Sequence, residues 1–302
     1  MDNLTHSLVG AVLGRMGLKR LTPLAMPAMI ISANLSDVDS FVAPLFGTTA
    51  RTFHRGFTHG IGGAFTMPFL AAAIILVHEK LHQSKEGRVK LAGLLAVCFI
   101  AFLSHPALDY LNTYGVRLLE PFSHRWFYGD TLFILDPWIW MMLILGLEFS
   151  WRAERLGRDW TRPAAWAFTA MLAYIGINAF ISVRAVAAAR PLVERVGTPT
   201  AVVAGEVPLE FWTREVMWRT EKLGGTVHYS AFSGPRLDAR AVALNLDNPL
   251  LAEARRTDRD VCTFLFWSRM PLVLSLDGKF YLSDQRFPAL RRTTFMVPLD
   301  KR

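Results

Sequence analysis

Histidine and aspartate residues recur in the first half of the sequence at spacings that suit metal binding. The tightest pair is His105 and Asp109, in the segment HPALD. Residues four apart lie on one face of a helix, about one turn from each other, so the imidazole and the carboxylate could bind the same ion. The alternative is a hydrogen bond between the two side chains that stabilises the end of a helix.

Two further histidines lie in the segment FHRGFTH. His54 and His59 are five residues apart, and they would converge best with His54 in a loop and His59 in the first turn of a helix. Arg55 carries a permanent charge and five N–H donors, which suit either a phosphate oxygen or a carboxylate. We therefore expect Arg55 either to contact a substrate or to orient Asp37 or Asp39.

Asp37 and Asp39 follow the second apolar stretch, in the sequence SDVD. Residues two apart do not share a helix face, so we expect one to bind the ion. The other would cap a helix, accept a hydrogen bond from a histidine or act on a water molecule. The sequence leaves these roles open, and a simple turn is the alternative. His6 is a weaker candidate ligand, which the predicted topology brings to the same side of the membrane.

The loop after the HPALD segment offers groups that suit an anionic substrate. Asn112, Tyr114 and Arg117 supply an amide, a phenol and a guanidinium, and we expect them to bind the substrate. Asp130 and Asp136 come later in this loop. For both we favour a role as helix cap or as partner of an arginine.

Long apolar stretches must hold these residues. The chain has 302 residues, of which 52% are hydrophobic and 19% charged, and this is too apolar for an ordinary soluble enzyme. A membrane-spanning helix needs about 20 apolar residues, with a range of about 17–25. We expect a polytopic helical bundle of about six apolar helices, and the last three stretches have the full length. The stretches are 5–18, 22–36, 62–77, 91–110, 131–149 and 164–186.

Lysine and arginine clusters mark the predicted topology. They lie in short loops near residues 19–20, 80–90 and 152–162, and such loops are usually cytoplasmic. This predicts a multi-pass protein of the bacterial inner membrane whose N-terminus and His/Asp clusters are extracytoplasmic. The net charge of +8 then reflects topology, so we expect membrane lipid as a partner and no nucleic acid. The oligomeric state cannot be predicted from these features.

Residues 191–302 have a mixed composition typical of a separate domain. Apolar and polar residues alternate in TVHYSAF and KFYLSD, and the Asp-Gly pair at 277–278 favours a hairpin turn. The stretch at 247–262 favours a helix. We expect a membrane-embedded, metal-binding helical domain at 1–190 and a small extracytoplasmic α+β domain at 191–302.

The motifs in the first half of the chain resemble those of bacterial membrane-bound metal-dependent hydrolases. The shared elements are MDNLTH at the N-terminus, DVD at 37–39, HRGFTH at 54–59, HPALD at 105–109, NTYG at 112–115, PFS at 121–123 and DP at 136–137. This family is distantly similar to zinc-dependent phospholipases C and single-strand nucleases, which are helical phosphoesterases. The resemblance implies zinc ligands among His6, Asp37, Asp39, His54, His59, His105 and Asp109. A clear second His-x-x-x-Asp or Glu is missing, so we expect one or two ions rather than three.

Together these features predict a metal-dependent hydrolase that acts on a phosphoester, including a lipid-linked one. A divalent ion, zinc in the first instance, would activate water. Asp37 or Asp39 would orient or deprotonate that water, and Arg55 and Arg117 would neutralise the phosphoryl group. One alternative is a structural or regulatory metal-binding membrane protein, which a closed coordination sphere would favour. The second is an ion or small-solute transporter, which a continuous polar track would favour.

Overall fold

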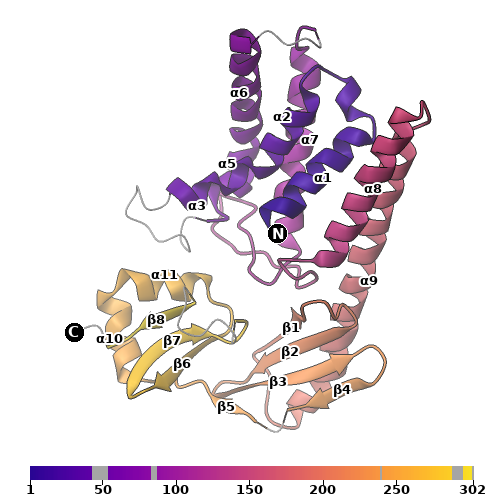
Figure 1. The fold of residues 1–302 in the computed structure, drawn as a ribbon. Helices are drawn as coiled ribbons and strands as arrows, with labels where there is room; N and C mark the ends of the chain where they lie inside the picture. The colour runs from indigo at the N-terminus through magenta and orange to yellow at the C-terminus, as the bar shows by residue number, and fades with distance from the viewer. Residues whose placement is uncertain (43–53, 83–86, 239, 288–294, 301–302) are drawn as a thin grey trace. The chain divides into compact units, whose positions relative to one another are not determined.

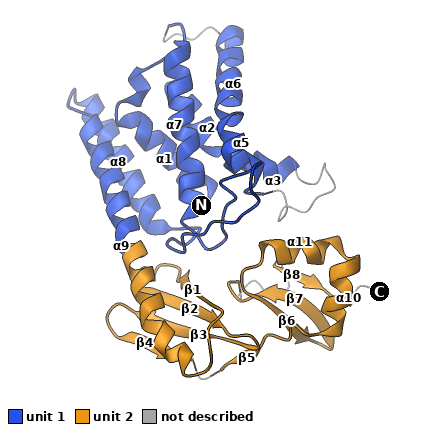
Figure 2. Ribbon diagram, turned by 180° about the vertical axis from the view of Figure 1, so that it is seen from behind, with its two compact units in different colours: residues 1–177 blue, residues 178–302 orange. Residues whose placement is uncertain are grey.

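A computed structural model describes residues 1–42, 54–82, 87–238, 240–287 and 295–300 of the chain. The chain forms two compact units, residues 1–177 (unit 1) and 178–302 (unit 2) (Figure 2). The division falls inside helix α9 (Thr161–Glu194), because the second half of this helix packs on the sheet of unit 2.

Unit 1 is helical (Figure 1). Short 3-10 turns join several of its helices, and two of these turns carry candidate site residues. In chain order the elements are α1 (Asn3–Arg15), η1 (Leu18–Arg20), α2 (Ala25–Asn34), η2 (Leu35–Asp37), α3 (Val38–Val42), η4 (Phe57–His59), α5 (Ile61–Ala64), α6 (Met67–His82), α7 (Leu91–Tyr110), α8 (Pro137–Arg155) and the first half of α9.

Three helical segments are long and apolar enough to cross a membrane. They are Ile61–His82, which combines α5 and α6, then Leu91–Tyr110 and Thr161–Glu194. The expectation of six apolar spanning helices is therefore not supported within the described residues. α1 and α2 have only 13 and 10 residues, which are too few to cross a hydrocarbon layer of about 30 Å.

The spanning helix expected at 131–149 is also not among the three candidate spans, because the helix found there, α8, runs from Pro137 to Arg155. Helix α8 begins at Pro137 because the Asp136 carboxylate accepts hydrogen bonds from the backbone N–H groups of Trp138 and Ile139, as in an N-cap. Asp136 is thus the helix cap that the sequence favoured. The last two turns of α8 are charged and do not suit a membrane interior; the charged residues there are Glu148, Arg152, Glu154 and Arg155.

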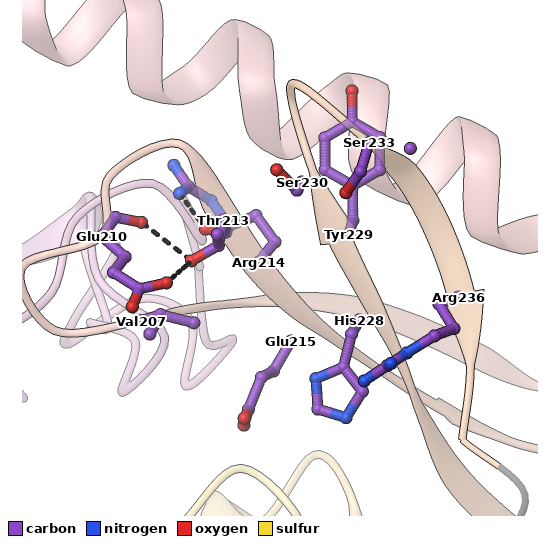
Figure 3. Close-up of a pocket in the computed structure, with 11 residues that line it drawn as sticks. Val207, Glu210, Thr213, Arg214, Glu215, His228, Tyr229, Ser230, Ser233 and Arg236 are labelled. Carbon is purple, nitrogen blue, oxygen red and sulfur yellow. Dashed lines mark hydrogen bonds between the residues drawn. The ribbon is translucent and has the colours of Figure 1, made fainter.

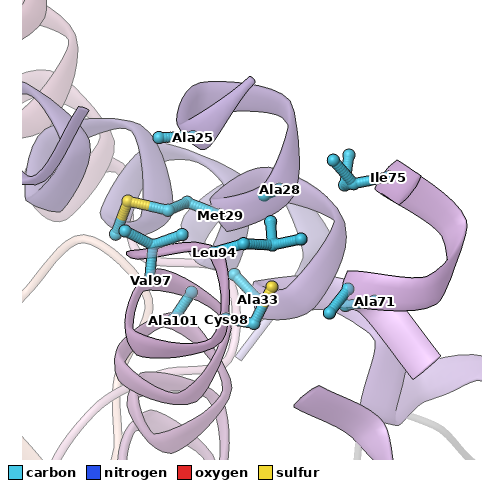
Figure 4. Packing of buried hydrophobic residues seen from close by; sticks show 11 residues of the cluster. Ala25, Ala28, Met29, Ala33, Ala71, Ile75, Leu94, Val97, Cys98 and Ala101 are labelled. Atoms are coloured by element: carbon cyan, nitrogen blue, oxygen red, sulfur yellow. The ribbon is translucent and has the colours of Figure 1, made fainter. Parts of the chain in front are cut away.

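Small side chains bring α2 and α7 close together. A hydrogen bond of 2.7 Å from the Ser32 hydroxyl to the Cys98 carbonyl also joins the two helices, and small residues permit such close backbone approach. This packing fixes the last two turns of α7, with His105 and Asp109, against the end of α2. Residues of the two helices in the shared cluster are Ala25, Ala28, Met29, Ala33, Leu94, Val97, Cys98 and Ala101 (Figure 4).

Unit 2 has the α+β composition that the sequence predicts. Its first sheet is antiparallel in the order β1-β2-β3-β4, with β5 paired to β3, and its second sheet has the order β6-β7-β8. The strands are β1 (Ala201–Glu206), β2 (Thr213–Arg219), β3 (Leu223–Ser230), β4 (Gly234–Leu237), β5 (Val242–Ala243), β6 (Pro271–Leu276), β7 (Lys279–Asp284) and β8 (Met296–Pro298). Helices α10 (Pro249–Thr257) and α11 (Arg259–Trp267) connect the sheets.

The turns and packing of unit 2 follow from its sequence. Asp277 and Gly278 both have positive φ, 52° and 74°, which a two-residue hairpin turn requires, and β6 and β7 pair on either side. The C-terminal turns of α9 cover the first sheet, where Ala185 and Ala189 pack near Trp218.

Candidate metal centre

Four side chains from three separate segments of unit 1 meet at one point. Asp37 comes from η2, His59 from η4, and His105 and Asp109 from α7, and their ligand atoms lie within 4.8 Å of one another. The two His Nε2 atoms are 3.0 Å apart, and each is 3.4 Å from Asp37 Oδ1. Tetrahedral zinc bonds of about 2.0–2.2 Å separate neighbouring ligand atoms by roughly 3.3–3.6 Å. The distances to Asp37 match this spacing, and the two Nε2 atoms lie slightly closer.

The hydrogen bonds of His105 and His59 decide which nitrogen faces the centre. His105 Nδ1 lies 2.6 Å from the Ala33 carbonyl, and a carbonyl only accepts, so this nitrogen carries the hydrogen. The Thr58 hydroxyl donates to Asp39 Oδ2 and therefore accepts from His59 Nδ1, at 2.9 Å. Both Nε2 atoms consequently face the centre, and two imidazole nitrogens this close need a proton or a metal ion between them.

Asp39 lies beside the centre and is surrounded by donors. Its carboxylate accepts hydrogen bonds from the Arg55 backbone N–H at 3.0 Å and from Thr58 at 2.7 Å, with His54 Nδ1 at 2.8 Å. It also lies 3.4 Å from His59 Nδ1. Carboxylates that hold a metal-binding histidine in this way fix its tautomer and orientation. Asp39, His54 and His59 also form a second group with metal-ligand spacing.

His6 closes another side of the centre. Its ring stacks on His105 with centroids 3.8 Å apart, and its Nε2 lies 3.5 Å from Asp109 Oδ1. Burial lowers the pKa of His6 to about 3, which keeps the ring neutral. Within the described part of the chain, neither His6 nitrogen nor Asp109 Oδ2 has a hydrogen-bond partner. Buried polar atoms without partners fit a metal ion, which would supply the missing interaction.

Arg55 is buried and pairs with a different aspartate from those the sequence suggested. Its guanidinium Nη2 lies 3.1 Å from Asp109 Oδ1, and Nη1 donates to Asn112 Oδ1 at 2.8 Å. Only its backbone N–H reaches Asp39. The side chain therefore orients Asp109. Asp109 Oδ1 contacts the Arg55 guanidinium, and Oδ2 faces His59 and His105.

The three residues expected to bind substrate lie outside the group of four central side chains. Asn112 and Tyr114 contact Arg55, and Arg117 pairs with Glu120. The Tyr114 ring lies under the Arg55 guanidinium, at 4.8 Å, and Asn112 Oδ1 also accepts from the Tyr114 backbone N–H. Arg117 is buried, pairs with Glu120 at 2.6 Å and lies over the ring of Trp126. Sequence analysis missed Glu120, although its spacing of three residues from Arg117 is a detectable signal for such a pair.

Three carboxylates surround His59 at the centre. Burial lowers the pKa of His59, but the carboxylates of Asp109, Asp37 and Asp39, at 3.3–3.4 Å, outweigh this effect and raise its pKa to about 10. Burial raises the pKa of Asp37, yet hydrogen bonds with His105 and His59 bring it well below the usual range. A divalent cation would satisfy the same carboxylates.

Residues 1–185, which include this whole centre, match the family described as YdjM inner membrane protein. The chain belongs to the YdjM family. Over 151 residues it is 28% identical to YfhP, an uncharacterized protein of Bacillus subtilis (strain 168). This alignment covers 47% of the chain and 43% of YfhP, so the chain spans less than half the length of this relative. No solved structure matches the chain. The comparisons show a membrane protein family, and they do not show the similarity to hydrolases or phosphoesterases that the motifs suggested.

The YdjM match ends before the sheets of unit 2, which have a polar cavity of their own (Figure 3). The cavity has a volume of about 530 Å³ and lies along β2, β3 and β4. Arg214 in its wall is anchored to α9, where it donates to Ser182 and to Asn178. Among the described residues, both groups with metal-ligand spacing lie in unit 1.

Proposed function

We propose that this YdjM family member binds a divalent metal ion through Asp37, His59, His105 and Asp109 and uses it to hydrolyse a phosphoester. The observation that carries the proposal is the pair of Nε2 atoms of His59 and His105, 3.0 Å apart, with two carboxylates at similar distances. Two imidazoles and two carboxylates are a donor set that suits zinc. A second ion at Asp39, His54 and His59 would require His59 Nδ1 to lose its hydrogen and the imidazole to bridge both ions.

The residues around the four ligands favour a catalytic role for the ion. A bound divalent ion would lower the pKa of a water molecule and polarise the ester. Asp39 would hold His59 in its ligand tautomer, and Arg55 would keep Asp109 turned toward the centre. The side chain of Asp37 is 14% exposed whereas those of His59, His105 and Asp109 are fully buried, so water or substrate would approach from the Asp37 side.

A specific observation favours a second candidate function, a structural metal site. Four protein ligands fill a tetrahedral coordination sphere, and closed spheres are typical of structural zinc. In that case the ion would only tie η2 and η4 to the end of α7.

We further propose that the metal centre is extracytoplasmic. The centre lies at the C-terminal end of α7, whereas the basic residues Lys80, Arg88 and Lys90 lie at the other ends of the two candidate spans, near the end of α6 and just before α7 (Figure 1). Basic turns of this kind mark the cytoplasmic side. The same proposal places unit 2 on the extracytoplasmic side.

Elemental analysis and a phosphoester panel test the proposal on the purified full chain. We expect about one or two divalent ions per chain and hydrolysis that a chelator abolishes. Asp37→Asn should lose turnover, whereas the exposed control Asp159→Asn should retain it. Bound metal without turnover would select the structural function, and absence of metal would reject both.

A further inference from the structure

The segments that carry the metal centre have an apolar outer surface. We define the apolar rim by the large hydrophobic side chains exposed in residues 36–42, 54–66 and 111–135. Phe122 and Phe41 are 80% and 78% exposed. The members of the rim are Val38, Phe41, Phe57, Phe65, Leu119, Phe122, Ile134 and Leu135.

Charged side chains are almost absent from this surface. In the described residues of the three segments, Arg125 is the only exposed residue with a fixed charge, and the exposed imidazole of His124 next to it pairs with Glu120. The other end of unit 1 differs sharply, since its exposed side chains include many cations. These are Arg20, Lys80, Arg88, Lys90, Arg152, Arg155, Arg158 and Arg162. A surface in water normally mixes both charge signs, so the rim does not have the composition of an aqueous surface.

The rim continues the surface of a membrane-spanning segment. Within Ile61–His82, exposed residues such as Phe69, Ile74 and Val77 form an apolar side. Phe65 belongs to this segment and to the rim, and Phe57 lies just before it in η4. The lipid-facing surface of the span therefore extends without a charged break onto the turn that holds His59.

We propose that the apolar rim inserts into the interface of the lipid bilayer on the side of the metal centre. Exposed aromatic side chains concentrate at that depth, where apolar rings contact acyl chains. Arg125 among them suits an anionic headgroup. The contact itself is independent of catalysis. The consequence for substrate rests on the proposed function: molecules that reach Asp37 would come from the membrane interface.

Spin labels on the full chain in nanodiscs of phosphatidylethanolamine and phosphatidylglycerol test the insertion. Phe122→Cys would be labelled in a Cys262→Ser background, because Cys262 is exposed and Cys98 is buried. Oxygen, which partitions into lipid, and a water-soluble nickel chelate would then compete as relaxation agents. We expect the label at 122 to favour oxygen, as a label at Val77 in the candidate span should. A label at Phe232, which is 84% exposed in unit 2, is the aromatic control and should favour nickel.

Nickel accessibility at 122 equal to that at 232 would overturn the proposal. Phe41→Cys provides a second reporter if the first variant does not fold, and the same two outcomes apply to it. Metal content of the labelled proteins separates the two hypotheses. Insertion without bound metal would reject the proposed function alone, and bound metal with a water-exposed label would reject the insertion alone.

Discussion

Two buried aspartates, one in each unit, have very different surroundings. Asp284 in unit 2 accepts hydrogen bonds of 2.9 Å from Arg286 Nε, Nη2 and backbone N–H, with further bonds from the Ser268 hydroxyl and two backbone groups. Asp109 in unit 1 places Oδ1 against Arg55 and the Met1 ammonium. Its Oδ2 accepts no hydrogen bond from the described residues, although His59 Nε2 lies 3.3 Å away.

The difference separates a structural carboxylate from a candidate ligand. All the acceptor capacity of Asp284 is used to tie β7 to the loop after α11, so nothing remains for a ligand. Asp109 keeps one oxygen unsatisfied among histidines, and this arrangement is costly unless a cation completes it. Burial alone would not have distinguished the two residues.

The largest effect should follow from breaking the buried ion pair between Arg286 and Asp284. Arg286→Met leaves Asp284 buried without its cation, and we expect the opening free energy of β6 and β7 to fall by about 3–5 kcal/mol. Hydrogen exchange on the full chain in detergent measures it. The double variant with Asp284→Asn, which removes both charges, should lose less. A double variant that is less stable than the single one would contradict the interpretation.

Removing a ligand from the unsatisfied cluster should remove the metal. For His105→Ala and for Asp109→Ala we expect metal affinity to fall by more than about 100-fold, because even residues behind the ligands cost about 10–100-fold. Elemental analysis after equilibration with zinc gives the result. His78→Ala, which changes an exposed histidine of α6, is the matched control. Unchanged metal content in both variants would reject the assignment of this pair.

Asp39 should have an intermediate effect. Asp39→Asn retains the shape of the side chain but weakens its hold on His59, so we expect a loss of metal affinity of about 10–100-fold. Asp37→Asn should cost more, because Asp37 faces both Nε2 atoms. Zinc titration of both variants makes the comparison, and the reverse order would exchange the two roles.

The stability of unit 2 should fall in acid. Burial raises the pKa of Asp284, but Arg286 outweighs it through charge and hydrogen bonding, so the pKa is lowered. A lowered pKa in the folded state stabilises the fold above the unfolded pKa of about 3.9 and loses that contribution as pH falls toward the folded value. We expect hydrogen-exchange protection of β7 to decrease by up to about 1.4 kcal/mol per pH unit there. Arg286→Met should flatten this dependence.

The smallest effect is expected at the opposite end of unit 1. Glu154 pairs with Arg15 at 2.6 Å and with Lys19, but its side chain is 37% exposed. Exposed ion pairs contribute about 1 kcal/mol or less. Glu154→Gln should therefore lower the thermal midpoint of unit 1 only slightly and leave its metal content unchanged. A loss of stability as large as that of Arg286→Met would show that the exposure of Glu154 does not predict the contribution of this ion pair.

Several features could be predicted from local sequence. The cap at Asp136, the hairpin at 277–278 and the helix that holds His105 and Asp109 depend on a few neighbouring residues, and the structure has all three. The six-span prediction failed for the two short stretches at the N-terminus and for the stretch whose helix ends in charged residues. The helices α1 and α2 are apolar but short, and α8 is long but charged at its end.

Residue types and spacing alone determined that this chain has apolar helices, a β-rich C-terminal part and a set of histidines and aspartates suited to a cation, because helix periodicity, turn chemistry and ligand chemistry are local properties. Tertiary structure alone decided that Asp37 rather than Asp39 faces His105, and that Arg55 pairs with Asp109. Such choices depend on distances between segments far apart in the chain, which the packing of α2 against α7 fixes.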